Sequence, residues 1–581
     1  MNQSKESRFE EALVRYRKKW DKIKDPCVLY KFPIPRTSCK ELFLKRVKEH
    51  PNKTYIMHKG KSYTYAECNE LAARLANGMF GCGLRKGDRV ITYVSNGYEF
   101  VAIAQACFKT GIIMVNTNPR STADEIMRRI ADCTPKLVIA DSDAADAVLE
   151  ALREDSLGVE HRVFCPALVK ENCWEGLEPW ESLVSDSIAE PAIEVCPEDI
   201  AILQYTGGTT GVLKGCCQTN HAFVAKALAQ VQYFRPFLND ADYEHYMVII
   251  ALGMSHAFGF SQGIVVNLTM GGTIFFADTL EEILKAIEVY KPTVWPAVPL
   301  WMKLIASKEE YQKYDIRSLK VITCGSAPLP VEVIHRVEEL TGAVITEGYG
   351  MTETVNTIAI NGQVHRKVGT VGVVNPNIEY LIVDQEHGEE VVEDGQPGEI
   401  ICRGECVMKE YWNNPEETAH MVRDGWLYTG DIGRIDEEGF LIILDRKKDL
   451  IITGGFNVFP SELEAIAMTC PNVADAIAIG IPDERRGEIP VMLAQPKEGA
   501  EIDLVELEQV CRSKLSRFKV PKAYYSIRPC PWSSAPSPPA PGTRCATAWA
   551  APTSRPIPSS QPCPPAPGTM RRSSRSSPTG S

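Results

Sequence analysis

The residues from Tyr205 to Gly215 combine glycines, threonines and a lysine, and read Tyr-Thr-Gly-Gly-Thr-Thr-Gly-Val-Leu-Lys-Gly. Glycines let the backbone turn tightly and expose its N–H groups, while the threonine hydroxyls and Lys214 add donors and a positive charge. Such a segment can surround a polyphosphate with donors from several sides. It is not a Walker A loop, because Leu213 and Gly215 stand where that loop needs Gly and Ser or Thr. Taken alone, the segment is either a phosphate-binding loop or a flexible surface loop.

Six further motifs with chemically distinctive residues follow along the chain. They are Met-Ser-His-Ala-Phe-Gly at 254–259, Gly-Ser-Ala-Pro at 325–328, Glu-Gly-Tyr-Gly-Met-Thr-Glu at 347–353, Tyr-Thr-Gly-Asp at 428–431, Asp-Arg-Lys-Lys-Asp at 445–449 and Gly-Gly-Phe-Asn-Val-Phe-Pro-Ser-Glu at 454–462. In this order, the seven motifs resemble those of the adenylate-forming superfamily (acyl-CoA ligases, luciferases and peptide-synthetase adenylation domains). The resemblance runs from about residue 40 to about residue 527. Gly207 and Asp445, where many members carry Ser and Gly, make the chain most similar to the fatty-acyl-CoA ligases.

The resemblance implies a two-step chemistry on a small-molecule carboxylic acid. A carboxylate is a poor acyl donor because its leaving group would be an oxide, so ATP first converts it to an acyl-adenylate with release of pyrophosphate. A thiol, usually that of coenzyme A, then attacks the acyl carbon and expels AMP. Since two anions must meet, the carboxylate and the α-phosphate, the site needs cations and aligned donors. ATP, Mg²⁺ and coenzyme A are therefore the expected cofactors.

The resemblance also assigns expected contacts to individual residues. The β- and γ-phosphates are held by Thr206, Gly207, Gly208, Thr209, Thr210, Gly211 and Lys214. One wall of the adenine pocket is formed by Gly325, Ser326, Ala327 and Pro328. The third motif contributes Glu347, Gly348, Tyr349, Gly350, Met351 and Thr352, of which Tyr349 stacks on the base and Thr352 bonds the α-phosphate. Glu353 helps to hold Mg²⁺, a hard cation that prefers oxygen ligands, while Asp431 accepts both ribose hydroxyls and Arg446 reinforces that contact.

Several of these residues also have a simpler structural interpretation. Tyr349 by itself is typical of a core position, and Asp431 in Thr-Gly-Asp is typical of a turn. Thr352 and Glu353 together form a helix-cap signal. These interpretations stay open beside the functional ones.

His256 also has two interpretations, which weigh equally. An isolated histidine next to Phe258 in an uncharged segment fits a hydrogen-bonded core residue. By the resemblance, it borders the acyl pocket and responds to the incoming carboxylate, together with Phe258 and residues after Glu353 such as Asn356. The predicted catalytic residues are Lys214, His256, Thr352 and Glu353.

The charged motif at 445–449 is expected to join a large domain to a smaller one. By the resemblance it is a hinge, and Lys448 is the residue that turns most. Rotation about it would bring Gly454, Gly455 and Phe456 to the coenzyme A tunnel, so that one active site serves two reactions. A solvated charge run is the alternative.

Alternating short apolar runs and amphipathic segments predict a mixed α/β fold with largely parallel sheets. Strands are expected at Val90–Val94, Ile112–Val115 and Leu137–Ala140, and a helix at Phe100–Thr110. With the resemblance, four segments are expected: an N-terminal helical extension (1–39), a large adenylation (AMP-binding) domain (40–445), a small mobile α+β lid domain (446–527) and a tail (528–581).

Composition bears on the binding partners and the cellular location of the protein. A net charge of −12 argues against nucleic acid as the main partner. The 19 cysteines show no zinc spacing and no secreted framework, and the charged N-terminus through Lys24 lacks a signal-peptide core, so a cytoplasmic location is expected. Oligomerisation and peripheral contact with a membrane stay open.

One segment, Met247 to Ala277, contains no Asp, Glu, Lys or Arg and is long enough to span a membrane. However, it also contains five glycines and several polar side chains. Buried strands and a helix in a large core are therefore expected, and no transmembrane segment.

The chain departs from the superfamily after Ile527. The segment from Pro529 to Ser581 has 14 prolines, 11 serines and no Lys, Asp or Glu, so it is either a disordered tail or a stretch outside the native reading frame. The superfamily carries a lysine here that bridges the carboxylate and the α-phosphate, whereas Lys522 is the last lysine of this chain. Arg544 is a poor substitute for it. We therefore expect slow adenylation and better-preserved thioester formation from supplied acyl-adenylate.

The predicted function is that of an ATP-dependent carboxylate–CoA ligase, an AMP-forming enzyme, acting on a medium- or long-chain fatty acid. Three alternatives remain. They are a ligase for an aromatic or alicyclic acid, an adenylation module that loads a carrier protein, and a catalytically weakened nucleotide-binding homologue.

Overall fold

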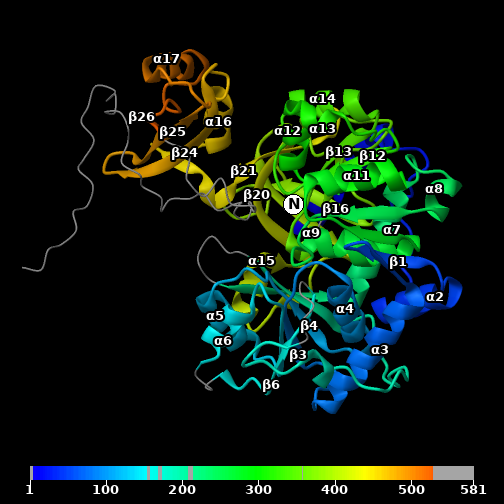
Figure 1. Ribbon diagram of the computed structural model, residues 1–581. Coiled ribbons are helices and arrows are strands. Elements are labelled where there is room, and N and C mark those ends of the chain that lie inside the picture. The colour runs from blue at the N-terminus through cyan, green and yellow to red at the C-terminus, as the bar shows by residue number, and fades with distance from the viewer. Residues whose placement is uncertain (1–3, 154–156, 168–172, 207–212, 356, 528–581) are drawn as a thin grey trace, which may run out of the picture. The chain divides into compact units, whose positions relative to one another are not determined.

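The computed structural model describes residues 4–153, 157–167, 173–206, 213–355 and 357–527. They form two compact units, one ending at Ile443 and the other beginning at Leu444 (Figure 1). The first unit contains three sheets, and the second contains one.

The first sheet of the first unit has seven strands, in the order β18-β8-β7-β4-β3-β5-β6. All pairings from β7 to β6 are parallel, whereas β7–β8 and β8–β18 are antiparallel. The strands are β3 (Arg89–Tyr93), β4 (Ile113–Asn116), β5 (Leu137–Ala140), β6 (His161–Phe164), β7 (Ile200–Thr206), β8 (Lys214–Thr219) and β18 (Glu410–Tyr411). Around them gather α3 (Tyr65–Gly81), α4 (Tyr98–Thr110), α5 (Ala123–Cys133) and α6 (Ala145–Ala151) (Figure 1).

The second sheet has nine strands, in the order β15-β14-β13-β12-β11-β9-β10-β1-β2. The six strands from β13 to β1 are all parallel, so their carboxyl ends share one edge. The strands are β1 (Thr54–His58), β2 (Lys61–Thr64), β9 (Met247–Ile250), β10 (Thr273–Phe276), β11 (Val294–Ala297), β12 (Val321–Cys324), β13 (Val344–Tyr349), β14 (Ala359–Ile360) and β15 (Val373–Val374). The accompanying helices are α2 (Cys39–Glu49), α7 (Asn220–Phe234), α8 (Asp240–Glu244), α11 (Leu280–Tyr290), α12 (Pro299–Ser307), α13 (Glu309–Gln312) and α14 (Val331–Thr341).

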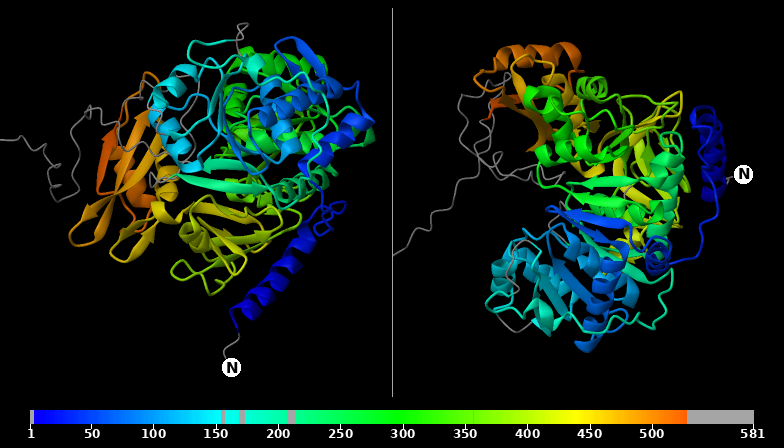
Figure 2. Two further views of the ribbon diagram at one scale, coloured as in Figure 1. Left: turned by 90° about the horizontal axis from the view of Figure 1, so that it is seen from below. Right: turned by 45° about the vertical axis from the view of Figure 1, so that its right-hand side comes forward.

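The third sheet has five strands, and its β16–β17, β17–β20 and β19–β20 pairings are antiparallel. Its strands are β16 (Ile378–Val383), β17 (Gly398–Gly404), β19 (Val422–Arg423), β20 (Trp426–Ile435) and β21 (Leu441–Arg446), and β21 continues past Ile443 into the second unit. The N-terminal helix α1 (Lys5–Ile23) lies along this sheet (Figure 2). The helix α15 (Pro415–Met421) comes directly before β19 in the chain. Phe9, Tyr16 and Trp20 form the buried face of α1.

The second unit is a small α+β body. Its strands are β22 (Ile451–Thr453), β23 (Phe456–Val458), β24 (Val473–Asp483), β25 (Gly487–Pro496) and β26 (Ala523–Ser526), and its helices are α16 (Pro460–Ala467) and α17 (Leu504–Lys514). All pairings are antiparallel except β25–β26. The predicted α/β class with largely parallel sheets and a small α+β unit is therefore confirmed.

Local predictions agree with the structure to within one or two residues. The strand predicted at Leu137–Ala140 has those bounds, and the other two predicted strands are shifted by one residue. The helix predicted at Phe100–Thr110 begins two residues earlier, at Tyr98, and is buried throughout the predicted range.

The uncharged segment Met247–Ala277 forms core elements, as predicted. Between β9 and β10 in the chain lies a helical run, which consists of α9 (Ala257–Phe260), a π-helical turn (Ser261–Val266) and α10 (Asn267–Met270). Within the described parts of the chain, no helix is long and apolar enough to cross a membrane.

Candidate nucleotide and acyl site

Three of the predicted motifs lie at the carboxyl ends of parallel strands, at one edge of the nine-stranded sheet. β9 ends shortly before His256, β12 ends directly before Gly325, and β13 contains Glu347 to Tyr349. β12 and β13 are neighbours, with Cys324 opposite Glu347. The carboxyl edge of a parallel sheet is where α/β folds bind ligands, because the loops there converge.

Close approaches confirm that these motifs meet. A Cβ atom on Gly325 would lie 3.7 Å from the carbonyl oxygen of Gly348 and 4.0 Å from the ring of Phe258. The next three residues, Ser326, Ala327 and Pro328, are exposed. The predicted adenine wall is therefore accessible to a ligand and adjoins the predicted acyl pocket.

Two residues at this edge have an unusual backbone conformation. Ser326 has a φ of 74° and Val355 a φ of 48°, both in the left-handed region. This region is unfavourable for residues other than glycine, and most of all for a β-branched residue such as Val355. Backbone strain of this kind is concentrated at functional sites, where the surrounding structure holds it in place.

Glu353 is a buried carboxylate next to a neutral donor. It lies on a short 3₁₀ helix (Thr352–Thr354), and the hydroxyl of Tyr411 donates to its Oε1 at 2.6 Å. Burial raises the pKa of the Glu353 carboxyl group. Gln218 fixes the same short helix by donating to the carbonyl oxygen of Thr352 at 2.7 Å.

Glu353 fits a magnesium site only together with a phosphate ligand. Among the described residues, no group of three or more His, Cys, Asp or Glu side chains could hold a metal ion. Mg²⁺ is commonly bound by one or two carboxylates plus the oxygens of substrate phosphates and water. One carboxylate, Glu353, is what the first unit supplies here.

Lys214 is a second neighbour of Tyr411. It begins β8 opposite Thr206, and its ammonium group pairs with Glu417 at 2.5 Å. The same nitrogen lies 5.7 Å from the centre of the Tyr411 ring. Lys214 and Glu353 therefore share one aromatic neighbour, so a phosphate chain near Tyr411 would be within reach of both. The loop residues Gly207, Gly208, Thr209, Thr210 and Gly211 lie outside the described residues, as does Asn356.

Tyr349 and Asp431 contact each other directly. The Tyr349 hydroxyl donates to Oδ2 of Asp431 at 2.7 Å, although the two residues lie on different sheets. Burial and the Asp431 carboxylate raise the pKa of the Tyr349 hydroxyl well above its usual range, so it stays protonated. The structure therefore places the predicted base-stacking and ribose-binding residues side by side.

A bulge in β20 presents Asp431. Glu399 pairs with Ile432 and Ile401 with Tyr428, so the single residue between them on β17 faces three residues on β20. Gly430 has a φ of 71° and donates to the Glu399 carboxylate at 3.1 Å. Bulges next to active sites redirect a side chain in this way. The turn interpretation and the ligand interpretation of this motif are thus compatible.

His256 is positioned as a helix cap. Its Nδ1 accepts the N–H of Phe258 at 3.2 Å at the start of α9. Solvent reaches the ring, yet the surrounding protein partly desolvates it and lowers the imidazole pKa. Because Nδ1 accepts a hydrogen bond, the neutral ring carries its proton on Nε2 and can donate from there.

The remaining predicted residues belong to the second unit. Asp445 accepts the backbone N–H of Arg446 at 2.9 Å and that of Ser461 at 3.0 Å. Gly454 and Gly455 have φ values of 59° and 82°, a turn conformation that favours glycine. The next residue in that turn, Phe456, is 55% exposed. The roles of Arg446, Gly454, Gly455 and Phe456 toward ligands stay predictions.

Tyr411 and Gln218 were not predicted as site residues. Tyr411 lies 58 positions from Glu353 in sequence, and Gln218 lies 134 positions from Thr352. Neither lies in one of the recognised motifs, and no local periodicity indicates these contacts. The pairing of β18 with β8 and the hydrogen bond from the Met408 N–H to the Glu353 carbonyl oxygen bring Tyr411 to the site.

The chain is similar to known families, relatives and solved structures. The family described as "AMP-binding enzyme" matches residues 43–412, and the "AMP-binding enzyme C-terminal domain" matches residues 462–531. The long-chain-fatty-acid–CoA ligase of Bacillus subtilis is 33% identical over 85% of this chain and 92% of its own length. The 4-coumarate-CoA ligase 1 of Narcissus pseudonarcissus is 32% identical over 79% of this chain and 84% of its own. The crystal structure of ATP-bound MatB from Rhodopseudomonas palustris covers 84% of this chain and 95% of its own, with a TM-score of 0.75 and 29% identity.

Proposed function

The chain belongs to the AMP-binding enzyme family, and we propose that it is an AMP-forming acyl-CoA synthetase that ligates a carboxylic acid to coenzyme A. The observation that carries this proposal is the arrangement of Lys214, Tyr411 and Glu353 beside the Tyr349–Asp431 pair. A cation, a carboxylate and a ribose acceptor are the groups that binding of a nucleoside triphosphate would require, which supports the proposal.

The proposed reaction has two balanced steps. A carboxylate oxygen of the acid bonds to the α-phosphorus of ATP, the bond from that phosphorus to the β-phosphate bridge breaks, and pyrophosphate leaves. The sulfur of coenzyme A then bonds to the acyl carbon, the bond to the AMP oxygen breaks, and AMP leaves while the thiol proton passes to solvent. Both steps require anionic oxygens to be held close together, which fixed donors and cations achieve.

Each residue then has a proposed role on ATP. Lys214 and Thr206 bind the β- and γ-phosphates, and Thr352 bonds the α-phosphate. Glu353 would hold Mg²⁺, which neutralises phosphate charge when bound. The remaining nucleotide contacts would come from Gly325, Ser326, Ala327, Pro328, Glu347, Gly348, Tyr349, Gly350, Met351, Asp431 and Arg446.

Other residues would contact the acid and coenzyme A. His256 would donate from Nε2 to the carboxylate of the acid. Its ring is neutral and lies next to Phe258, so the apolar part of the acid can lie beside it. The turn at Gly454, Gly455 and Phe456 would contact the pantetheine arm of coenzyme A, because glycines allow a thin chain to approach closely.

We propose a medium- or long-chain fatty acid as the substrate. The Bacillus subtilis relative is named for long-chain fatty acids, and the segment behind His256 is a buried, uncharged helical run. The 4-coumarate relative makes an aromatic acid the second candidate. Pyrophosphate release with octanoate, dodecanoate, benzoate and 4-coumarate tests both. Preference for dodecanoate supports the proposal, and strict preference for the aromatic acids contradicts it.

The two half-reactions are proposed to differ in rate. Without the lysine that the superfamily places after Lys522, adenylation would be slowed by about 10²–10³-fold, the usual cost of one preorganised charge. Thioester formation from synthetic acyl-adenylate would be less affected. Equal and rapid rates for both half-reactions would contradict this proposal.

We also propose a cytoplasmic location. The 16 cysteines within the described residues are all free, which fits a reducing compartment. Cell fractionation tests this: recovery of the protein in a secreted fraction would contradict it.

A further inference from the structure

The N-terminal helix α1 contacts both ends of the strand that carries Asp431. At the start of β20, the ring of Phe9 packs edge-on against Trp426 with 5.6 Å between the ring centres. Arg403 lies over the same Trp426 ring and pairs with Glu10 of α1 at 2.5 Å. Figure 2 shows the helix running along the antiparallel sheet.

Beyond the other end of β20, α1 holds the turn to β21. The indole N–H of Trp20 donates to the carbonyl oxygen of Gly439 at 3.3 Å, and the Lys19 ammonium donates to the carbonyl oxygen of Asp436 at 3.3 Å. The contact is close, since a Cβ atom on Gly439 would lie 3.0 Å from Cβ of Lys19. Gly439 also has a φ of 112°, which a side chain would disfavour.

In the middle of β20, the ladder to β17 is interrupted at the bulge that presents Asp431. Side chains partly replace it: the Thr429 hydroxyl donates to the carbonyl oxygen of Ile400 at 2.7 Å and accepts the N–H of Asp431 at 3.1 Å. A bulge leaves its extra residues without ladder partners, so their position depends on how the strand is held on either side. The contacts of α1 lie outside this bulge on both sides, at Trp426 before it and at the turn residues Asp436 and Gly439 after it.

We propose that α1 is a brace that positions Asp431 and thereby sets the affinity for the nucleotide. This inference rests on the proposed function, in which Asp431 accepts the ribose hydroxyls. Trp20 and Lys19 are then positioning residues, since they act through β20 and its turn. The helix would affect nucleotide binding more than binding of the acid.

The test compares the same substitution, Trp to Phe, at two positions of the first unit. Trp20→Phe keeps an aromatic ring and removes the N–H that Gly439 accepts. Trp180→Phe makes the same change in the short helix Trp180–Ser182, which packs near β6. AMP affinity is measured by calorimetry on the full-length protein, together with the melting temperature of each variant.

Loss of one hydrogen bond should weaken AMP binding by about 3- to 10-fold in Trp20→Phe and leave it unchanged in Trp180→Phe. A lower melting temperature with unchanged AMP affinity would show that α1 only stabilises the fold, which overturns the inference. If Trp20→Phe does not fold, Lys19→Met replaces it, and unchanged AMP affinity in that variant overturns the inference equally.

The proposed function is tested separately, by acid-dependent pyrophosphate release from the unaltered protein. Absence of that release would contradict the ligase proposal. The AMP affinities would still decide whether α1 acts as a brace, because they do not depend on turnover.

Discussion

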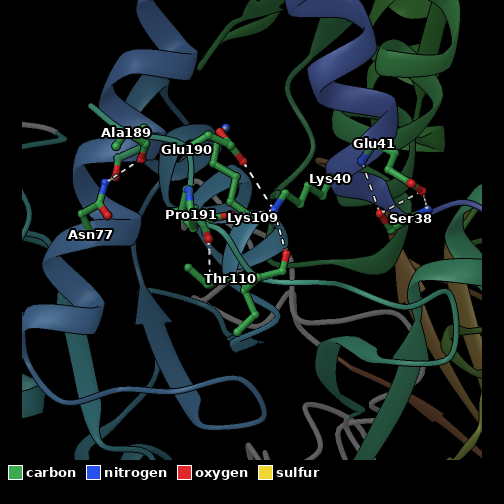
Figure 3. Close-up of polar contacts among 12 residues, drawn as sticks. Ser38, Lys40, Glu41, Asn77, Lys109, Thr110, Ala189, Glu190 and Pro191 are labelled. Carbon is green, nitrogen blue, oxygen red and sulfur yellow. Dashed lines mark hydrogen bonds and ion pairs between the residues drawn. The ribbon is translucent and has the colours of Figure 1, made fainter. Parts of the chain in front are cut away.

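Two carboxylates of the first unit, Glu190 and Glu353, have opposite surroundings. Glu190 forms an ion pair with Lys109 and lies 3.6 Å from the Lys40 ammonium group (Figure 3). The Lys109 side chain is fully buried, and its nitrogen also faces the ring of Phe43 at 5.5 Å. Glu353 is buried too, but its partner is the neutral hydroxyl of Tyr411, and it forms no ion pair within the described part of the chain.

The contrast separates a structural network from a binding site. Around Glu190, lysines on α2 and α4 hold an extended segment, and Lys40 also donates to the carbonyl oxygens of Pro191 and Ile193 at 3.0 and 2.9 Å. There the carboxylate has cationic partners from the chain itself and needs no ligand. At Glu353 the Tyr411 hydroxyl and the charge of Lys214 offset burial only in part, so the carboxyl pKa stays raised, and a bound cation would offset the rest. The same substitution at the two positions should therefore have opposite effects.

The largest effect is expected from Glu353→Gln. Loss of the charge that holds Mg²⁺ should slow acid-dependent ATP–pyrophosphate exchange by about 10²–10³-fold. The free energy of unfolding should stay equal or rise slightly, because glutamine still accepts from Tyr411 and no charge is buried. Unaltered exchange, or a large loss of stability, would show that Glu353 has a structural role like that of Glu190 and does not hold Mg²⁺.

Glu190→Gln should lower the stability of the protein and leave its activity unchanged. It leaves the buried Lys109 ammonium without its carboxylate and should lower the free energy of unfolding by about 2–3 kcal/mol, less than for a fully buried pair because solvent reaches Glu190. Exchange per folded molecule should not change. The double variant Lys109→Met/Glu190→Leu is the control, since an apolar pair should recover most of the stability in urea unfolding.

A smaller effect is expected at the Tyr349–Asp431 contact. Tyr349→Phe removes the hydroxyl that donates to Asp431 and should weaken ATP binding by about 3- to 10-fold. Tyr246→Phe is the matched control, because the buried Tyr246 hydroxyl has no hydrogen-bond partner among the described residues. Equal ATP affinities in the two variants would show that the contact does not orient Asp431.

The smallest effect concerns pH. Burial raises the Glu353 pKa, so as pH falls this carboxylate takes up a proton at a higher pH than an ordinary glutamate and loses its affinity for Mg²⁺. The acid limb of the exchange rate should move to lower pH as the Mg²⁺ concentration rises, since metal and proton compete. The lowered pKa of His256 should produce a second change in the exchange rate with pH, and the position of that change should not depend on the Mg²⁺ concentration. An acid limb unaffected by Mg²⁺ would contradict the metal role of Glu353.

Local patterns predicted the elements well and the long-range contacts poorly. The apolar run at Leu137–Ala140 and the helix ending at Thr110 depend on neighbouring residues, so periodicity located them. Tyr411 meets Glu353, and Trp20 meets Gly439 across 419 positions, only because of how the sheets assemble. An amphipathic pattern identifies a buried face of α1 but not the strand that it contacts.

The proposed reaction joins an acid to coenzyme A by way of an acyl-adenylate. ³¹P NMR of the protein with ATP, Mg²⁺, dodecanoate and coenzyme A tests it most directly. AMP and pyrophosphate should form in equal amounts, matched by dodecanoyl-CoA and absent without the acid. Cleavage of ATP to ADP and phosphate, or AMP formation that does not depend on the acid, would contradict it.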